Sequence, residues 1–309
     1  MTSKTAGIIT IGSHPNSPVG CTGAAVNERS TGGNVSEGET MADTNPQTDH
    51  PELSAENRDI WNANAKWWDE RVGDGNDFQN YLIEPASETL LEITPGESVL
   101  DIACGAGRFT RRMAELGARV TAFDQAAAFI ERARERSKEF EIDFRVLDAG
   151  EDEALEQFPD GGFDKAVCTM ALMDMPDVEP LFRNLRRLLR PGGCFVFTVT
   201  HPCFHSAGVA SVAEQSENAE GRLITRSGIK ISRYLTPFAR KSEGILGQPV
   251  PQYVFHRPLQ VLLGYGFRYG MAVDGLLEPR LPELETMSDV SWKQMTELPP
   301  VMAVRMRRI

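Results

Sequence analysis

The sequence predicts an α/β protein built on a doubly wound, mostly parallel sheet with helices on both faces. From residue 98 onward, short apolar segments alternate with helical segments of about ten to fifteen residues, which is the pattern of consecutive βαβ units. The apolar segments are hydrophobic at successive positions rather than at alternate ones. Strands of this kind are covered on both faces, so we expect helices on either side of the sheet.

The elements of this pattern follow one another in a regular order. The predicted strands are Ser98–Ala103, Arg119–Phe123, Ile142–Leu147, Phe163–Thr169 and Cys194–Val199. The predicted helices are Arg108–Leu116, Ala126–Phe140 and Val178–Leu189. The alternation lapses after Thr200, and beyond it we expect a mainly helical segment, a strand and an edge strand, at Pro251–Tyr265, Phe267–Leu277 and Val301–Arg307.

The part of the chain before the sheet divides into two regions. Residues 1–52 are rich in Gly, Ser, Thr, Asn and Pro and have no hydrophobic periodicity, so we expect a disordered N-terminal extension. Met41 precedes a polar, acidic stretch and would serve equally well as the start of the protein. Residues 53–97 are expected to form a helical cap. Its first helix carries Trp61 and Trp68, which either dock the helix on the core or form an aromatic lid over a ligand cleft.

Charge and composition exclude several classes of function. The net charge of −12 and the lack of a long Lys/Arg run argue against binding to nucleic acid or to an anionic membrane surface. No apolar run approaches the ~20 residues of a membrane span, and the apolar patch near the start is too short for a secretory signal. The five cysteines include no C-x-x-C pair, which favours reduced thiols over a disulfide framework. We therefore predict a cytoplasmic protein.

A glycine-rich turn, DIACGAGRFT, begins at Asp101, the end of the first predicted strand. Glycine has no Cβ, so Gly105 and Gly107 let the backbone approach a ligand closely. Asp124 follows the second strand, about twenty residues further on, where a carboxylate can accept hydrogen bonds from ribose hydroxyl groups. Both features belong to the carboxyl ends of neighbouring parallel strands, so they indicate a site for an adenosine-bearing cofactor.

Two residues distinguish this turn from a dinucleotide fingerprint. Thr110 stands where the G-x-G-x-x-G pattern requires a third small residue. Asp101 stands four residues before Gly105, where a carboxylate repels a pyrophosphate but attracts an ammonium group. The turn therefore indicates a nucleoside that carries a methionine moiety rather than NAD.

On these residues the chain resembles a known family. VLDIACGAGRFT resembles the first-strand motif of the class I, Rossmann-like S-adenosylmethionine-dependent methyltransferases, in particular the small-molecule group related to the ubiquinone-biosynthesis enzymes. VLDAGE, CTMALMDMPD and LRRLLRPGGCFVFT are similar to later motifs of the family, and the resemblance covers roughly residues 61–275. One departure is Ala103-Cys104, where many members have Gly-Cys. The resemblance implies seven strands with the last one antiparallel, within a methyltransferase domain at residues 98–309.

The resemblance also implies which residues bind S-adenosylmethionine. Asp124 would hold the ribose hydroxyl groups, and Asp148 would meet the adenine amino group. The alternative is that the glycines only shape a turn and that the two acids cap helices. The expected cofactor-binding residues are Asp101, Ala103, Gly105, Gly107, Asp124, Gln125, Asp148, Ala149, Cys168 and Met170.

The acceptor substrate is expected on the same side of the sheet. His201 follows the fifth strand and His256 begins a later segment; each is a candidate general base, since histidine titrates near neutrality, or a structural residue. Residues 201–255 form a long insertion, which is typical of a substrate lid. The expected substrate or lid residues are Trp61, Trp68, Tyr81, His205 and Tyr253. We expect no metal, because Pro202 breaks helical spacing between His201 and His205.

The predicted function is methylation of a small molecule at N, O or C, with release of S-adenosylhomocysteine. One alternative is a protein that binds S-adenosylmethionine without transferring its methyl group. The other is an NAD-linked oxidoreductase, which Asp101 and Thr110 disfavour. The sequence indicates no oligomeric state.

Overall fold

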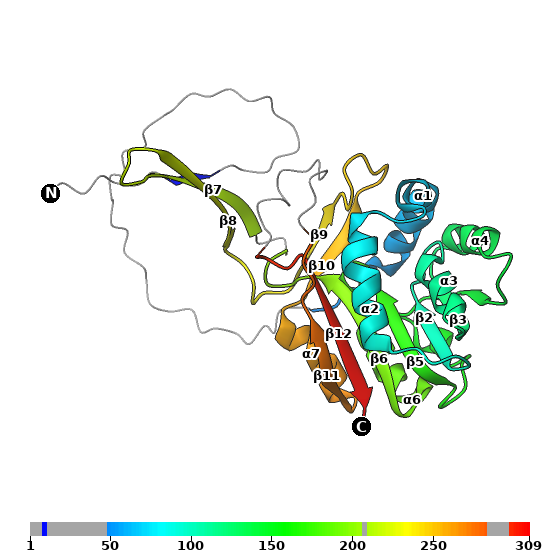
Figure 1. Cartoon of the computed structure of the whole chain (residues 1–309). Coiled ribbons are helices and arrows are strands. Elements are labelled where there is room, and N and C mark those ends of the chain that lie inside the picture. The colour runs from blue at the N-terminus through cyan, green and yellow to red at the C-terminus, as the bar shows by residue number, and fades with distance from the viewer. Residues whose placement is uncertain (1–7, 11–47, 206–208, 283–296) are drawn as a thin grey trace, which may run out of the picture. The chain divides into compact units, whose positions relative to one another are not determined.

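The computed structural model of the protein describes residues 8–10, 48–205, 209–282 and 297–309 (Figure 1). These residues form two compact units. One unit contains residues 8–10 and 210–230, and the other contains the remaining described residues, 48–205, 209, 231–282 and 297–309. The expected start at Met41 and most of the expected disordered extension lie outside the described residues.

The larger unit is built on a seven-stranded sheet. Its strands, in the order in which they lie side by side, are β11 (Met271–Leu277), β12 (Val301–Arg308), β6 (Leu189–Thr200), β5 (Phe163–Thr169), β2 (Ser98–Ile102), β3 (Arg119–Asp124) and β4 (Asp143–Val146). The pairs from β6 to β4 are parallel, while β12 is antiparallel to both of its neighbours. The predicted fold class and the antiparallel last strand are therefore confirmed.

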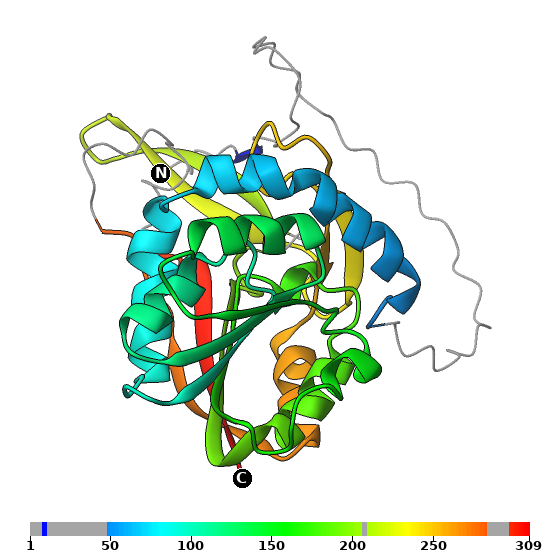
Figure 2. The same cartoon turned by 90° about the vertical axis from the view of Figure 1, so that its right-hand side faces the viewer.

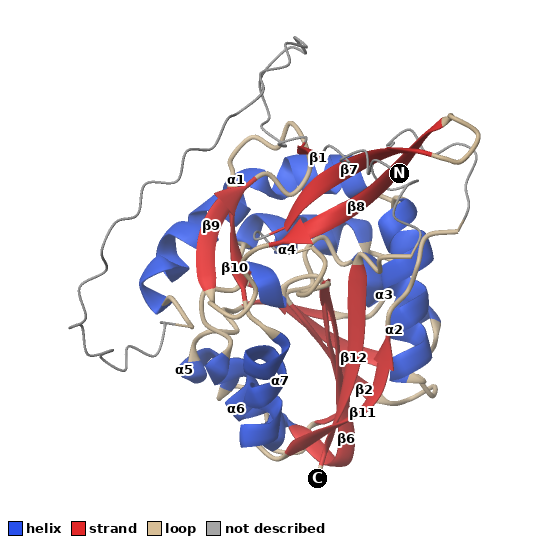
Figure 3. Ribbon diagram, turned by 90° about the vertical axis from the view of Figure 1, so that its left-hand side faces the viewer, coloured by secondary structure: helices blue, strands red, loops and turns tan. Residues whose placement is uncertain are grey.

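Helices cover both faces of this sheet (Figures 2 and 3). The helices of the larger unit are α1 (Ser54–Val72), α2 (Glu84–Leu91), α3 (Arg108–Glu115), α4 (Ala127–Arg136), α5 (Asp152–Leu155), α6 (Glu179–Leu188) and α7 (Leu259–Arg268), with short turns η1 (Pro51–Leu53), η2 (Gln79–Ile83) and η3 (Leu172–Asp174). Apolar residues of α2 and α3 pack against one face, and those of α6 and α7 pack against the other.

The central strand β2 explains why the strand segments are apolar at successive positions. Its Val99 packs in the core on the α2 and α3 side, whereas Leu100 and Ile102 pack in the core on the α6 and α7 side. All three side chains are fully buried. Alternate residues of a strand point to opposite faces, so a strand with helices on both sides buries every residue.

The insertion after β6 contains strands that the sequence did not predict. In the smaller unit, β1 (Ile8–Thr10) pairs antiparallel with β7 (Val209–Glu217), whose other neighbour is β8 (Leu223–Ile231). In the larger unit, β9 (Phe238–Ser242) pairs antiparallel with β10 (Gln252–His256). The role of residues 201–255 as a substrate lid stays a prediction.

Two expectations about the last third of the chain were wrong. Residues 252–256 are a strand, and the helix begins only at Leu259, because Pro258 disfavours a helical conformation in the residue before it. Residues 301–308 are not an edge strand, since β12 lies between β6 and β11. Its first four residues are almost completely buried, which accounts for their unbroken apolar sequence. No helix among the described residues is long and apolar enough to cross a membrane.

A buried arginine ties several of these segments together. Arg257, which is 4% exposed, donates hydrogen bonds to the carbonyl oxygens of Leu172 (3.1 Å), Met175 (2.9 Å) and Pro176 (3.1 Å). Its guanidinium also binds Asp49 at 2.7 Å. A buried charge is tolerated when its donors are satisfied in this way. Asp49 is thus held by the larger unit, although it falls within the segment expected to be disordered.

We predict that Arg257→Met lowers the free energy of unfolding by about 3–5 kcal/mol, because it removes the cation that pairs with the Asp49 carboxylate and the donor to the carbonyl oxygens of Leu172 and Met175. The matched control is Arg183→Met, which removes an ion pair with Asp152 whose partners are 46% and 39% exposed. That change is expected to cost less than about 1 kcal/mol. Urea unfolding of both variants measures the two losses of stability. Equal losses would contradict a stabilising role for the buried contacts of Arg257.

Candidate functional site

The carboxyl ends of the five consecutive parallel strands bring most of the predicted site residues to one edge of the sheet. Asp101 lies in β2 next to its end, and Asp124 ends β3. Asp148 follows β4, Met170 follows β5, and His201 follows β6. In open α/β sheets this edge is where ligands bind.

The glycine turn after β2 has a backbone suited to close contact with a ligand. Ala103, Gly105 and Gly107 have φ angles of 54°, 54° and 74°. A Cβ on Gly107 would lie 3.2 Å from the Cβ of Ala133, so this glycine also lets α3 approach α4. Around Gly105, by contrast, a Cβ would meet nothing within 4 Å. Ala103 has a side chain in the left-handed region, a form of strain that concentrates at functional sites.

Asp124 holds this turn in place. The N–H of Gly105 donates to its Oδ2 at 3.0 Å, and the N–H of Ala126 donates to its Oδ1 at 2.8 Å. Burial raises the pKa of the Asp124 carboxyl to about 6, although both backbone hydrogen bonds lower it. Each carboxylate oxygen has two lone pairs, so each can accept a second hydrogen bond from a ligand.

Asp101 is the most enclosed acid of the turn. The hydroxyl of Thr110 donates to its Oδ2 at 2.5 Å, while its Oδ1 is buried and has no hydrogen-bond partner. Burial raises the pKa of the Asp101 carboxyl to about 7. A buried polar atom without a partner is costly, so Oδ1 is a position where a donor from a ligand would be stabilising.

Asp148 is linked to α1. Its Oδ2 accepts a hydrogen bond from Arg58 at 3.2 Å, and its Oδ1 accepts one from the N–H of Gly150 at 2.9 Å. The following Ala149 is buried. Arg58 also binds Glu151, at 2.9 Å. The sequence reasoning missed Arg58, because nothing in its helical surroundings indicates a partner 90 residues away.

The aromatic residues of α1 pack beside the glycine turn. The ring of Trp61 lies 5.7 Å from that of Trp68 and 6.1 Å from that of Phe129. Both tryptophans join a core cluster that includes Ala106 of the turn. Both remain partly exposed, so the packing is compatible with docking on the core and with a lid.

Three further predicted cofactor residues differ in their surroundings. The Cys168 side chain is fully buried in the apolar core, because strand alternation turns it under α6. The role of Cys168 in cofactor binding stays a prediction. Met170 has a φ of 52°, and its N–H donates to the Thr198 carbonyl at 2.9 Å. Gln125 is partly exposed between Asp124 and α4.

The two candidate bases differ in which nitrogen is available. The Nε2 of His201 lies 2.8 Å from Glu278, and its Nδ1 accepts the N–H of Cys203 at 3.2 Å. Both ring nitrogens of His201 are thus engaged, which favours its structural interpretation. His256 donates from Nε2 to the carbonyl of Tyr234 at 2.6 Å, which leaves Nδ1 as the acceptor of the neutral ring. Burial lowers the pKa of both histidines.

A small cavity lies beside these histidines. It is lined by His205, His256, Arg257 and Thr200 together with apolar residues of η3, β6, β10 and α7. Burial, helped by the nearby His201, lowers the pKa of His205 to about 4, so this ring is neutral near pH 7. Tyr253 and Tyr81 do not line the cavity. The Tyr253 hydroxyl donates to Glu56 at 2.7 Å, and Tyr81, on η2, is 45% exposed.

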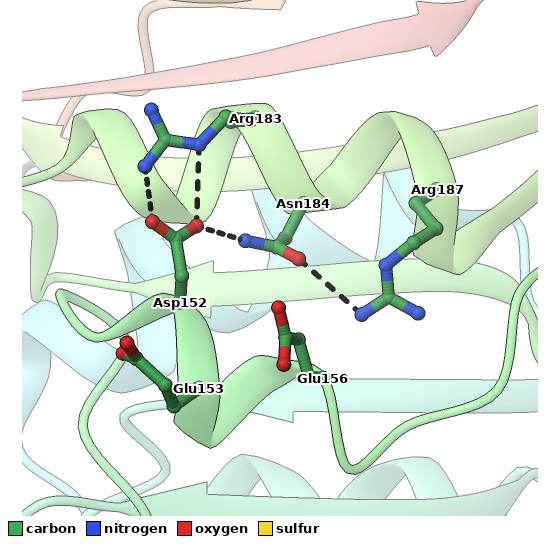
Figure 4. Close-up of a pocket in the computed structure, with 6 residues that line it drawn as sticks. All are labelled: Asp152, Glu153, Glu156, Arg183, Asn184 and Arg187. Atoms are coloured by element: carbon green, nitrogen blue, oxygen red, sulfur yellow. Dashed lines mark hydrogen bonds and ion pairs between the residues drawn. The ribbon is translucent and has the colours of Figure 1, made fainter.

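A larger hollow lies elsewhere, between α5 and α6 (Figure 4). It is lined by Asp152, Glu153, Glu156, Arg183, Asn184 and Arg187. Within it, Arg183 forms an ion pair with Asp152, and Asn184 donates a hydrogen bond to the same carboxylate. None of the predicted site residues lines it. Within the described ranges, no group of three or more His, Cys, Asp or Glu side chains is arranged to hold a metal ion.

A buried polar cluster near the same edge was missed by the sequence reasoning. Gln252 of β10 donates to Asp174 Oδ1 at 3.0 Å, and Asn57 of α1 donates to the Asp174 carbonyl at 3.0 Å. All three residues are at most 7% exposed. The available signal was the acid itself, which interrupts the apolar segment ALMDMP directly after β5.

Comparison with known sequences identifies relatives of this chain. Residues 100–197 match the family described as "Methyltransferase domain". The chain is 36% identical over 155 residues to a ubiquinone biosynthesis O-methyltransferase of Xanthomonas campestris pv. campestris (strain B100), an alignment that covers 48% of this chain and 62% of that protein. It is 38% identical over 134 residues to the protein of the same name from Xanthomonas euvesicatoria, covering 41% and 53%. The chain thus spans less than two thirds of the length of these curated relatives.

Solved structures share the fold. An S-adenosylmethionine-dependent methyltransferase from Mesorhizobium loti is 28% identical, with a TM-score of 0.59 over 76% of this chain and 99% of that one. The 1,6-didemethyltoxoflavin-N1-methyltransferase of Burkholderia thailandensis is 16% identical, with a TM-score of 0.51 over 87% and 98%. At that identity the second structure shows similarity of fold alone.

Because the pKa of Asp101 is raised in the folded state, the free energy of unfolding is expected to depend on pH through this residue. The folded value, about 7, exceeds the value of about 3.9 in an unfolded chain, so the folded state binds the proton more tightly. The stabilising contribution of protonated Asp101 is therefore present below about pH 4 and is lost as the pH rises through about 7. Asp101→Asn keeps an acceptor for Thr110 and does not titrate.

We predict that the stability of Asp101→Asn relative to the unchanged protein rises steadily between about pH 4 and pH 7. Urea unfolding of both proteins at several pH values measures this difference, in which the acids that do not interact with Asp101 cancel. A difference that stays constant across the window, or that falls with pH, would show that Asp101 is not held in a protonated, buried state.

Proposed function

The chain belongs to the class I S-adenosylmethionine-dependent methyltransferases, and from that premise we propose that it methylates a small molecule and releases S-adenosylhomocysteine. The observation that carries the proposal is the pairing of the positive-φ glycine turn with Asp124, whose carboxylate bonds the turn and keeps lone pairs for a ligand. The proposal covers the activity of the whole protein, its acceptor and its site residues.

The residues of this edge fit the cofactor. The open space at Gly105 admits close approach of a ligand to the backbone, and the buried Oδ1 of Asp101 lacks a donor, which an ammonium group would supply directly or through water. Asp124 would accept hydrogen bonds from the ribose hydroxyl groups. Asp148 and the backbone of Ala149 would meet the adenine, with Ala103, Gly107, Gln125 and Met170 completing the contacts.

When bound, S-adenosylmethionine supplies an electrophilic methyl group on a sulfonium. The protein's own residues then have to align the acceptor and exclude water. We propose that Trp61 and Trp68 help to close the site from α1, beside Ala106. Residues 201–255 are proposed to act as a substrate lid on the acceptor side, where His205 and His256 line the small cavity.

Two features support an acceptor that is a small molecule. The relatives of this chain are named for O-methylation in ubiquinone biosynthesis, and the chain's net charge of −12 disfavours a nucleic-acid substrate. Hydroxyl compounds are therefore the first acceptors to screen. We also propose a cytoplasmic location, because the four described cysteines are free thiols, as suits a reducing compartment.

We predict that the purified protein binds S-adenosylmethionine in a calorimetric titration and that Asp124→Ala weakens this binding about tenfold to a hundredfold, since a hydrogen bond to a charged group contributes about 1.5–3 kcal/mol. The matched control is Asp143→Ala, an exposed acid at the opposite end of the neighbouring strand β4, which should bind normally. NAD is titrated in parallel. Preference for NAD would revive the oxidoreductase alternative and overturn the proposal.

A further inference from the structure

Asn57, Asp174 and Gln252 form a buried polar cluster in which some hydrogen-bond acceptors have no donor. This feature is typical of a ligand site rather than of a purely structural network. The cluster joins three elements, because Asn57 lies on α1, Asp174 on η3 and Gln252 on β10. Their side chains are 0%, 7% and 4% exposed in that order. A buried polar atom normally has at least one hydrogen-bond partner, and each exception needs an explanation.

The acceptor atoms of this cluster are not all satisfied. The amide oxygen Oδ1 of Asn57 and the amide oxygen Oε1 of Gln252 are buried and have no hydrogen-bond partner. Each belongs to an amide whose nitrogen already bonds Asp174. The hydrogen bond from Gln252 goes to Oδ1 of the Asp174 carboxylate, and a carboxylate can accept further donors at Oδ2. The unfilled positions are therefore all acceptors.

The position of the cluster is that of an acceptor pocket. Asp174 lies four residues after Met170, at the carboxyl end of β5, next to the strand that carries Asp101. None of the three residues lines the small cavity itself, but Met173, next to Asp174 on η3, and Val254, two residues after Gln252 on the same face of β10, both line it. The cluster therefore adjoins that cavity, between η3 and β10.

We propose that Asn57, Asp174 and Gln252 bind the proton-bearing group of the methyl acceptor, a hydroxyl or an amine, and that Asp174 takes its proton. This inference rests on the proposed function. As the acceptor's oxygen or nitrogen forms a bond to the methyl carbon, the sulfur–methyl bond breaks and its electron pair stays on sulfur. The acceptor's proton passes to Asp174 Oδ2, so charge and atoms balance.

The charge of Asp174 suits this role. The side chains that hydrogen-bond it from α1 and β10 are neutral amides, and burial raises the pKa of its carboxyl to about 8, against the lowering effect of the Gln252 hydrogen bond. A group poised near neutrality is an effective general base. A donor that binds beside the carboxylate favours its ionised form and so lowers its pKa.

The test uses methylammonium, a small cation with three N–H donors, and tetramethylammonium, which has none. Both are titrated into the full chain while the side-chain amide NMR signals of Asn57 and Gln252 are followed. The two signals are assigned by their loss in Asn57→Asp and Gln252→Glu. Carbon-detected titration reports the pKa of the Asp174 carboxyl in the same samples.

We expect methylammonium to shift both amide signals in a saturable manner and to lower the Asp174 pKa, while tetramethylammonium does neither. Asp174→Asn keeps the shape of the side chain and an acceptor for Gln252, yet it should abolish the saturable shift. The matched control is Asp177→Asn, a partly buried acid of the same segment that bonds the N–H of Glu179, and it should keep the shift.

No shift with methylammonium, an equal shift with tetramethylammonium, or a shift that survives Asp174→Asn would overturn this site. Binding of S-adenosylmethionine is measured by calorimetry on the same samples. Asp177→Asn, which lies outside the proposed cluster, is expected to change that affinity by less than about twofold, or roughly 0.4 kcal/mol. Loss of cofactor binding in the unchanged protein would instead count against the proposed function, so the two proposals fail separately.

Discussion

The arrangement of the acceptor side depends on one buried cation, Arg257. Its guanidinium binds Asp49 and donates to the carbonyl oxygens of Leu172, Met175 and Pro176, so it holds the backbone on both sides of Asp174. Burying a guanidinium without these partners would cost several kcal/mol. These hydrogen bonds stabilise the observed conformation of the segment after β5, and with it the position of Asp174.

The cofactor side depends on backbone conformation instead. The glycine turn after β2 needs left-handed φ angles at Ala103, Gly105 and Gly107, and the hydrogen bond from the Gly105 N–H to Asp124 stabilises that conformation. The same carboxylate that fixes the turn remains able to accept from a ligand. Structural and ligand-binding roles thus coincide in one residue, which explains why a helix-capping interpretation and a ribose-binding interpretation of Asp124 were both open at the level of sequence.

Burial sets the electrostatics of both sides. It is the largest cause of the raised pKa of Asp101, Asp124 and Asp174, whose values are about 7, 6 and 8. Helices on both faces of the sheet remove water from the strand ends, and ionised carboxylates lose solvation there. When these acids are ionised and lack hydrogen-bond donors, they lower the stability of the folded state. Hydrogen-bond donors from a ligand would restore part of that stability. Stability and binding are therefore coupled at this edge.

The sequence by itself determined the parallel sheet, the glycine turn and the acid at the end of β3, because strand periodicity, positive φ angles and strand-end positions are local properties of the chain. Only the tertiary structure decided what depends on distant contacts. It inserted β12 between β6 and β11 and turned Cys168 into the core. It also joined Asp174 to Asn57 and Gln252, which lie 117 and 78 residues away, and no spacing rule connects residues that meet only when three separate elements pack together.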